Sequence, residues 1–538
     1  EEGINSITIL GGDFDGTNNP PYGGLVRGFG ENNEPIEGDI ITSQKIGNIF
    51  VANNLVNLDV RSEKSIGNVT VQDSIRVTQD VSISAPLSIG NIRAHEIVGT
   101  GSLNFGTGQL GNVFVNDDVR ATVLSSGRVN SVHIGGTLQE RFEVTGSSGF
   151  LNTFRVGNVT SSGSIVSANF IRNIMVFSGD LDGDVSAGGS ENGTLAIGRL
   201  QVWNGDLGGD VTVLTNESAV SPGGGIGFLF VSGDVLGDIT TATFTDPGTG
   251  DTTSGDVGTA ILLGDLRGDM DIAGGVQRLQ MPRGRITSNG DSSPRVDIEG
   301  NVGFFMVRGG GGASAVDDDL EVGGNLNRLI IGGGDFAGDL TVDQKVGFAM
   351  FQGPADMTGV LNAGSIQDLL LFGDQGVANT VSTSGRLGHL LTLNGVSSGG
   401  AVQANGGLGR LRSFGDVDGP ITVGGTGADF IQIGSMLNAP LSVQSGDLDT
   451  FIINNWNQDA VNAEIEVAGR LGFAQINGNV VSDIEVGNNQ PDDGIGTLRL
   501  MGDLEADLDV DGKVEKFQLI GGQVTDNGRR PSRASTCP

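Results

Sequence analysis

One short pattern recurs along almost the whole chain with a period of about 20 residues. It opens with an apolar residue, usually followed by Gly, and its fourth and sixth positions are also apolar. A fixed period of this length predicts a solenoid, in which each repeat forms one turn of a coil, and argues against a compact globular domain. The clearest copies of this cassette are Ile46–Val51, Ile66–Val71, Ile89–Ile92, Leu110–Val115, Ile197–Val202, Leu326–Ile331, Leu408–Leu411, Ile495–Leu500 and Val514–Leu519.

Each repeat reads as short strands joined by glycine-rich corners. Positions 4 and 6 of the cassette follow the two-residue period of a strand, as in Ile49 and Val51. A Gly-Asp or Gly-Asn turn follows, and then a second short strand such as Asp210–Val213. Because Gly punctuates every segment, no helix is expected. We therefore predict an all-β chain forming a single long parallel β-helix, with rungs of about 20 residues stacked about 4.7–4.9 Å apart. The crossover preference of parallel strands favours a right-handed coil.

The spacing of the cassettes divides the chain into three regions. Residues 1–45 are predicted to hold the first rung and an insertion, Gly11–Ser43, that caps it, since an open end exposes unpaired backbone groups. Residues 46–512 form the solenoid repeats, with inserted loops in 171–302 where the spacing widens. Residues 513–538 hold the last rung and a polar C-terminal tail.

The formal net charge of −34 limits the partners of the chain. Such an acidic chain is a poor ligand for nucleic acid and for anionic membranes, whereas it favours solubility and divalent cations. No apolar run reaches the roughly 18 residues of a membrane helix. The chain begins Glu1-Glu2-Gly3 without a methionine, as an exported and processed chain does. We expect an extracellular or cell-surface location, with no nucleic-acid partner and no membrane insertion.

The Ile-Gly-x-Leu-x-Val-x-Gly-Asp pattern resembles the parallel β-helix proteins of bacterial surfaces and filaments. That class includes adhesin-type passenger rods and bactofilin-like polymers. The resemblance covers nearly the whole chain and specifies a coil rather than one family. It implies a β-helical architecture and a structural role.

The sharpest polar feature is the repeated Gly-Asp-Leu-x-Gly-Asp corner. If equivalent positions stack, carboxylates one rung apart repel unless water solvates them or a cation bridges them, and calcium is the hard-cation candidate. The alternative is that each Asp accepts amide hydrogen bonds of its own turn, beside a Gly. No cofactor other than calcium is suggested. The predicted calcium ladder comprises Asp180, Asp184, Asp206, Asp210, Asp234, Asp238, Asp265 and Asp269.

The fifth cassette position is predicted to point outward, between the two inward residues. It is polar in many rungs, but in five successive rungs it is apolar and would form a continuous stripe, which a monomer rarely leaves bare. Either an inserted loop covers the stripe, or it is a lateral contact with another subunit, or this stretch has its faces reversed by a bulge. The five residues are Met306, Ile330, Met350, Leu370 and Leu391.

Together these features predict a structural protein and not an enzyme. The carboxylates follow the repeat and do not converge on one cleft, and His95, His133 and His389 belong to distant rungs. We expect a rigid acidic solenoid that self-assembles, end to end, laterally or both, into a filament, sheath or surface layer. One alternative is a surface adhesin or carbohydrate-binding rod whose loops in 171–302 recognise the ligand. A second is a β-helix polysaccharide lyase or glycoside hydrolase, which needs clustered carboxylates or calcium with a base.

Overall fold

The computed structural model describes residues 4–9, 14–15, 40–42, 44–146, 149–189, 195–214, 224–245, 252–253, 255–287, 296–309, 314–353, 356–487 and 493–525. Most of the predicted capping insertion Gly11–Ser43 lies outside these residues. So does much of the predicted loops in 171–302, and so does the whole tail from residue 526.

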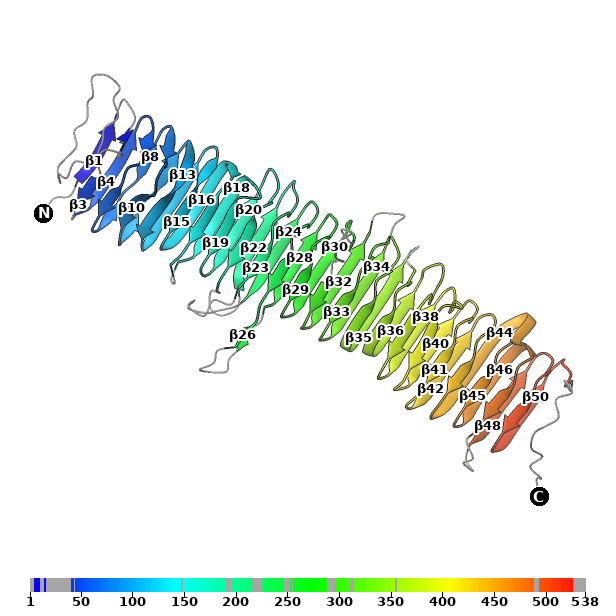
Figure 1. Ribbon diagram of the computed structural model, residues 1–538. Coiled ribbons are helices and arrows are strands. Elements are labelled where there is room, and N and C mark those ends of the chain that lie inside the picture. The colour runs from blue at the N-terminus through cyan, green and yellow to red at the C-terminus, as the bar shows by residue number, and fades with distance from the viewer. Residues whose placement is uncertain are drawn as a thin grey trace. The chain divides into compact units, whose positions relative to one another are not determined.

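The regular secondary structure of the described residues is β-strand throughout. The strands of the main sheet pair in parallel as a β-solenoid of about 20 turns (Figure 1), and β26 (Phe244–Thr245) and β27 (Thr252–Thr253) form a separate antiparallel pair. This confirms the predicted fold class. The chain divides into two compact units, which are described separately below. Unit 1 comprises Glu1–Gly284 and Asn289–Gly300, and unit 2 comprises Arg285–Ser288 and Asn301–Pro538.

Each rung begins with a cassette strand, and successive cassette strands pair in parallel. In unit 1 they are β1 (Ile4–Ile9), β4 (Ile46–Val51), β7 (Ser65–Ile66) with β8 (Val69–Val71), β11 (Ser88–Ile89) with β12 (Ile92–Ala94), β14 (Gln109–Val115), β16 (Arg128–Leu138), β18 (Leu151–Val159), β20 (Ile171–Val176), β22 (Leu195–Val202), β24 (Gly225–Val231), β28 (Val257–Leu262) and β30 (Val276–Met281). In unit 2 they are β32 (Val302–Arg308), β34 (Leu326–Gly332), β35 (Leu340–Gln352), β36 (Leu361–Leu371), β38 (Leu387–Thr392), β40 (Leu408–Ser413), β42 (Gly427–Ile433), β44 (Asp447–Val461), β46 (Leu471–Val480), β48 (Gly494–Leu500) and β50 (Lys513–Leu519).

Two further sides complete a rung. The second side is a short strand or a single bridging residue, such as Leu181, which pairs with Leu207 of the next rung. The third side is another strand. In unit 1 the third strands include β6 (Val60–Ser62), β10 (Val81–Ala85), β15 (Val119–Ser125), β17 (Arg141–Val144), β19 (Ser164–Ser167), β21 (Asp184–Ala187), β23 (Val211–Val213), β25 (Ile239–Thr241) and β29 (Met270–Ile272). In unit 2 they include β33 (Leu320–Val322), β37 (Thr380–Thr383), β39 (Ala401–Ala404), β41 (Ile421–Val423), β43 (Leu441–Val443), β45 (Ile465–Val467), β47 (Ile484–Val486) and β49 (Leu508–Val510).

The core of each unit lies inside its coil, where the inward cassette positions of successive rungs stack. Ile49 and Val51 of β4 are 1% and 0% exposed, as the strand period predicts. Glycine is required at the second cassette position for another reason, which is that consecutive rungs approach each other closely there. A Cβ on Gly67 would lie 2.3 Å from the carbonyl oxygen of Gly47 in the preceding rung. A side chain at this position would therefore push two rungs apart.

Candidate functional site

The predicted calcium residues of unit 1 form two stacked columns, one at each corner of the Gly-Asp-Leu-x-Gly-Asp segment. The first aspartate ladder consists of Asp180, Asp206, Asp234 and Asp265. The carboxylates of the first three accept the backbone amide hydrogen of the next aspartate along the ladder, with N–O distances of 2.9, 2.7 and 2.8 Å. The second aspartate ladder consists of Asp184, Asp210, Asp238 and Asp269. Its three bonds from a backbone amide to the carboxylate of the preceding aspartate have N–O distances of 3.1, 2.9 and 2.9 Å.

These bonds join consecutive rungs at corners, where the regular strand pairing is interrupted. A carboxylate that accepts a backbone amide is stabilised by that bond, which offsets part of the repulsion between stacked charges. Arg267 reduces the repulsion further, because its guanidinium lies 3.2 Å from Asp234 and 3.7 Å from Asp265. Beside the ladder, burial raises the pKa of Asp182, and the charges of Asp180 and Asp206 raise it further.

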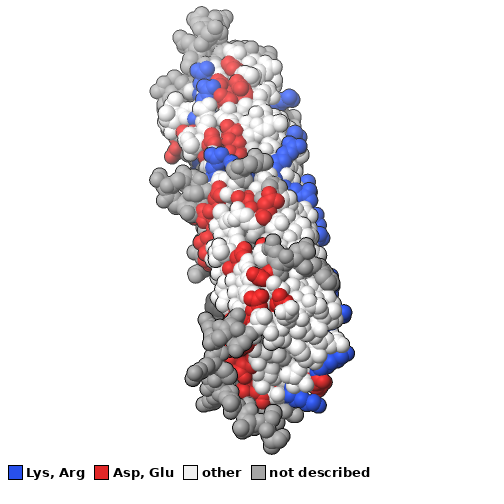
Figure 2. Space-filling view, turned by 90° about the vertical axis from the view of Figure 1, so that its right-hand side faces the viewer, with Lys and Arg blue, Asp and Glu red and all other residues white. Residues whose placement is uncertain are grey.

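Calcium binding by these ladders stays a prediction. Within the residues that the structure describes, no group of three or more His, Cys, Asp or Glu side chains is arranged to hold a metal ion. In the first aspartate ladder, the Oδ1 atoms of Asp180, Asp206 and Asp234 already accept amide hydrogens. Figure 2 shows acidic residues gathered on the visible surface, with basic residues mainly along its right-hand edge.

The calcium ladder and its alternative predict different responses to calcium. If the amide bonds alone hold the ladders, the melting temperature is the same in EDTA and in millimolar Ca²⁺. Thermal unfolding followed by circular dichroism provides the measurement. A melting temperature that rises with Ca²⁺, and no longer does so when Asp206 is replaced by Asn, would instead establish the calcium ladder.

The predicted apolar stripe lies in unit 2, and its five residues occupy one column of the paired cassette strands. Met306 pairs with Ile330, Ile330 with Met350, Met350 with Leu370, and Leu370 with Leu391. The residues on either side of Leu370, Leu369 and Leu371, are 0% and 1% exposed, so the column points outward. Ile330 is buried and the other four are partly exposed.

The apolar surface extends past the ends of these strands in two neighbouring rungs. Leu393 and Phe414 each follow a cassette strand, and their amides donate to the carbonyls of Leu371 and Thr392 in the preceding rungs. Both side chains are exposed, Phe414 by 56%. Exposed apolar side chains that adjoin one another mark candidate contact surfaces.

Sequence reasoning missed a second outward column, at the third cassette position, where Arg and Phe stack on one another. Arg199 lies over Phe228, with 5.2 Å from the guanidinium carbon to the ring centroid. Arg328 lies between two rings, at 5.7 Å from Phe304 and 5.4 Å from Phe348. Each such cation–π contact on an exposed surface stabilises by about 0.5–1 kcal/mol. The signal was readable, because Ile197-Gly-Arg-Leu200 is followed one rung later by Ile226-Gly-Phe-Leu229.

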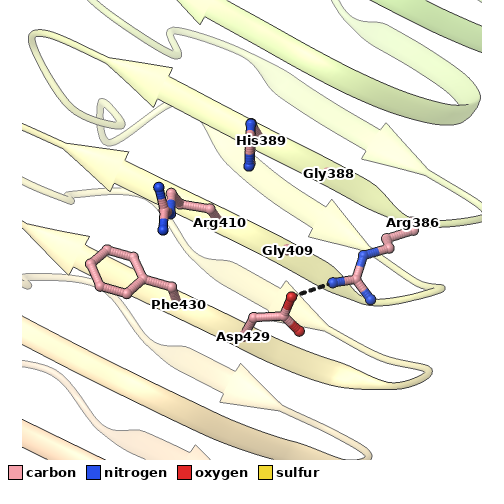
Figure 3. Close-up of a pocket in the computed structure, with 7 residues that line it drawn as sticks. All are labelled: Arg386, Gly388, His389, Gly409, Arg410, Asp429 and Phe430. Atoms are coloured by element: carbon pink, nitrogen blue, oxygen red, sulfur yellow. Dashed lines mark hydrogen bonds and ion pairs between the residues drawn. The ribbon is translucent and has the colours of Figure 1, made fainter.

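This third-position column borders a shallow hollow on the outer face of β38, β40 and β42 (Figure 3). The backbone of Gly388 and Gly409 forms its floor, and one wall is made by His389, Arg410 and Phe430. The hollow has a volume of about 300 Å³. It is therefore a small, open site on the coil surface and not a deep catalytic cleft.

The other wall of the hollow is an ion pair that spans two rungs. Arg386, just before β38, reaches Asp429 in β42, and its Nη2 lies 2.5 Å from the Asp429 carboxylate. On the first wall, His389 contacts Asp368 of the preceding rung, with 2.9 Å between Nδ1 and Oδ1. Arg410 lies over the ring of Phe430 at 5.0 Å. The hollow is thus lined by positioned cationic and aromatic groups.

The stacked parallel rungs define the chain as a β-solenoid repeat protein. No protein-family model, no curated protein and no solved structure matches it. In the part of the chain that the structure describes, there is no helix long and apolar enough to cross a membrane.

Proposed function

We propose that this protein is an extracellular structural protein, a rigid acidic β-solenoid that self-assembles into a filament, sheath or surface layer. The extracellular location rests on the sequence and on the resemblance to bacterial surface and filament proteins. Self-assembly is supported by the solenoid geometry, because each rung pairs with its neighbours through the backbone, and a rung with an open edge can pair in the same way with a rung of another copy.

The observation that carries the proposal is the exposure of core positions in β50, the last described cassette strand. Its inner partner is β48, and its other edge pairs with no described strand. Val514 and Phe517 occupy the first and fourth cassette positions, and they are 37% and 42% exposed. The equivalent residues one rung earlier, Ile495 and Leu498, are 1% and 0% exposed. A further rung, of the same chain or of another copy, would bury this apolar surface.

The first rung offers a matching surface. Cassette strand β1 carries Ile4, Ile7 and Ile9 at the first, fourth and sixth cassette positions, and β4 is the only described strand with which it pairs. Ile4 and Ile7 are only partly buried. We infer that β1 of one copy stacks on β50 of another, which continues both the backbone ladder and the apolar core. The half-exposed stripe and the neighbouring Leu393 and Phe414 are available for lateral contacts.

Replacing Phe517 with Asp should abolish end-to-end assembly, because the carboxylate would be buried without a partner at the joint. Light scattering against concentration and negative-stain images provide the measurement. Phe114→Asp is the matched control, since it also places a charge on an exposed Phe, which lies in β14, away from the first and last rungs and from the apolar stripe. If polymers persist in Phe517→Asp and disappear in Phe414→Asp, the copies associate laterally and not end to end.

A second control addresses the tail, which lies outside the described residues. A chain that ends at Thr525 lacks residues 526–538 and keeps β50. If β50 is the joint, this variant assembles at least as well as the full chain. Loss of assembly in the shortened chain would place the joint in the tail and overturn the proposed role of β50.

A surface adhesin or carbohydrate-binding protein is the second candidate, and the hollow over Gly388 and Gly409 favours it. The polysaccharide lyase or hydrolase alternative has less support. The hollow is lined by a single carboxylate, Asp429, which is paired with Arg386. Acid–base cleavage of a glycosidic bond uses two carboxylates. The residues around the hollow are suited to hold a ligand.

A further inference from the structure

We propose that the hollow of unit 2 is a binding site for an acidic sugar, a hexuronate, whose carboxylate is held by Arg410 and whose ring contacts the Arg386–Asp429 pair. This goes beyond assembly, because neither the last rung nor the apolar stripe lines the hollow. It would allow the coil to attach to an acidic polysaccharide.

The first step is the placement of the two cations. Figure 3 shows Arg386 and Arg410 on opposite sides of the glycine floor, so that a ligand between them contacts both. Arg386 is held in place by Asp429, two rungs away. Arg410 is held by its stacking on Phe430. Guanidinium groups fixed in this way lose little conformational freedom when they bind a carboxylate, and their planar fork matches its two oxygens.

The second step is the charge balance of the hollow. The chain has 64 acidic and only 30 basic residues. Yet in the described part of the chain, no carboxylate pairs with Arg410 or with Arg412, which lies 5.6 Å from the same Phe430 ring. The buried Nε of Arg412 also has no hydrogen-bond partner. Arginines without carboxylates in so acidic a chain leave a local excess of positive charge beside the hollow, which favours an anionic ligand.

The third step is the size and shape of the hollow. Its volume of about 300 Å³ is at the lower end for ligand sites, which favours a ligand as small as one sugar residue. The floor carries no side chain of its own, because a Cβ on Gly409 would lie 2.3 Å from the Gly388 carbonyl oxygen, and the Arg386 guanidinium lies beside it, with Nη2 3.4 Å from that Cβ position. The floor leaves room for a sugar ring, with the carboxylate toward Arg410 and ring hydroxyls toward the Asp429 and His389 side chains.

Binding is tested by saturation-transfer NMR titration of the full chain with three probes: glucuronate, glucose and inorganic sulfate, at low ionic strength. Glucuronate should bind, glucose should not, and sulfate should bind more weakly because it lacks the ring. Added salt should weaken glucuronate binding, since it screens the exposed arginines. Equal binding of glucuronate and glucose would overturn the role of the carboxylate. Sulfate binding as tightly as glucuronate would overturn the role of the sugar ring.

The residue assignment is tested by Arg410→Ala, which should weaken glucuronate binding by about tenfold or more. Arg410→Lys keeps the charge but loses the planar fork, and an intermediate affinity is expected. Arg328→Ala is the matched control, because Arg328 stacks on Phe side chains in the same column and does not line the hollow. Circular dichroism verifies that each variant is folded. Equal loss of binding in Arg328→Ala and Arg410→Ala, or no loss in Arg410→Ala, would overturn the proposal.

Discussion

Replacing Phe351 with alanine is expected to lower the free energy of unfolding of unit 2 by about 3–5 kcal/mol, the range for removing a large buried side chain. Phe351 is 0% exposed. Its ring packs edge-on against Phe336 of the same coil, with centroids 5.7 Å apart, and such pairs stabilise by about 0.5–1.5 kcal/mol beyond the buried area. Urea unfolding followed by circular dichroism gives the value.

Phe414→Ala serves as the comparison, because Phe414 belongs to the same unit but is 56% exposed. Its replacement should change stability by no more than about 0.5 kcal/mol. Similar losses for the two variants would show that the interior of the coil does not pack around Phe351, and would contradict the stacked core.

Gly395→Ala is expected to destabilise unit 2 by about 2–5 kcal/mol, since two effects add. Gly395 has a φ of 96°, where a Cβ is disfavoured. The Cβ would also lie 1.8 Å from the carbonyl oxygen of Asp416 in the next rung. The turn cannot easily move away, because Gly395 exchanges two hydrogen bonds with the Thr392 hydroxyl.

Gly353→Ala separates the two effects. Gly353 also has a positive φ, 76°, but no atom lies within 4 Å of the position that its Cβ would take. Only the backbone cost of about 1–2 kcal/mol should remain. Thermal and urea unfolding of both variants give the comparison. If Gly353→Ala is as damaging as Gly395→Ala, the close approach of the rungs is not what makes glycine necessary at position 395.

The fold could be predicted from the sequence because the cassette repeats both its period and its inward positions. Leu329 and Ile331, at positions 4 and 6 of their rung, are 0% exposed, as the pattern requires. Ile330 between them points outward in register with its neighbours, which the same pattern also anticipated. These features depend on local spacing, and local spacing is what a sequence displays.

The roles of the polar residues could be predicted only in part. The sequence pattern suggested that aspartates bond to their own turns, whereas Asp180 accepts the amide of Asp206, 26 residues later. This depends on how the rungs stack, which no local pattern specifies. The hollow was missed for a similar reason, since Arg386 and Asp429 are 43 residues apart. The Arg–Phe column was readable, because Arg199 and Phe228 occupy the third cassette position of successive rungs.

The first aspartate ladder has a consequence for how such a chain changes its length. Its links span 26, 28 and 31 residues, yet the bonds keep nearly the same length, 2.9, 2.7 and 2.8 Å. The link between turns therefore does not depend on the number of residues that separate its two aspartates. A deletion of part of a turn would instead leave an amide of one neighbouring turn and a carboxylate of the other without their hydrogen-bond partners. Such a chain therefore tolerates the gain or loss of complete turns and the growth of surface loops. Deletions that remove only part of a turn are selected against.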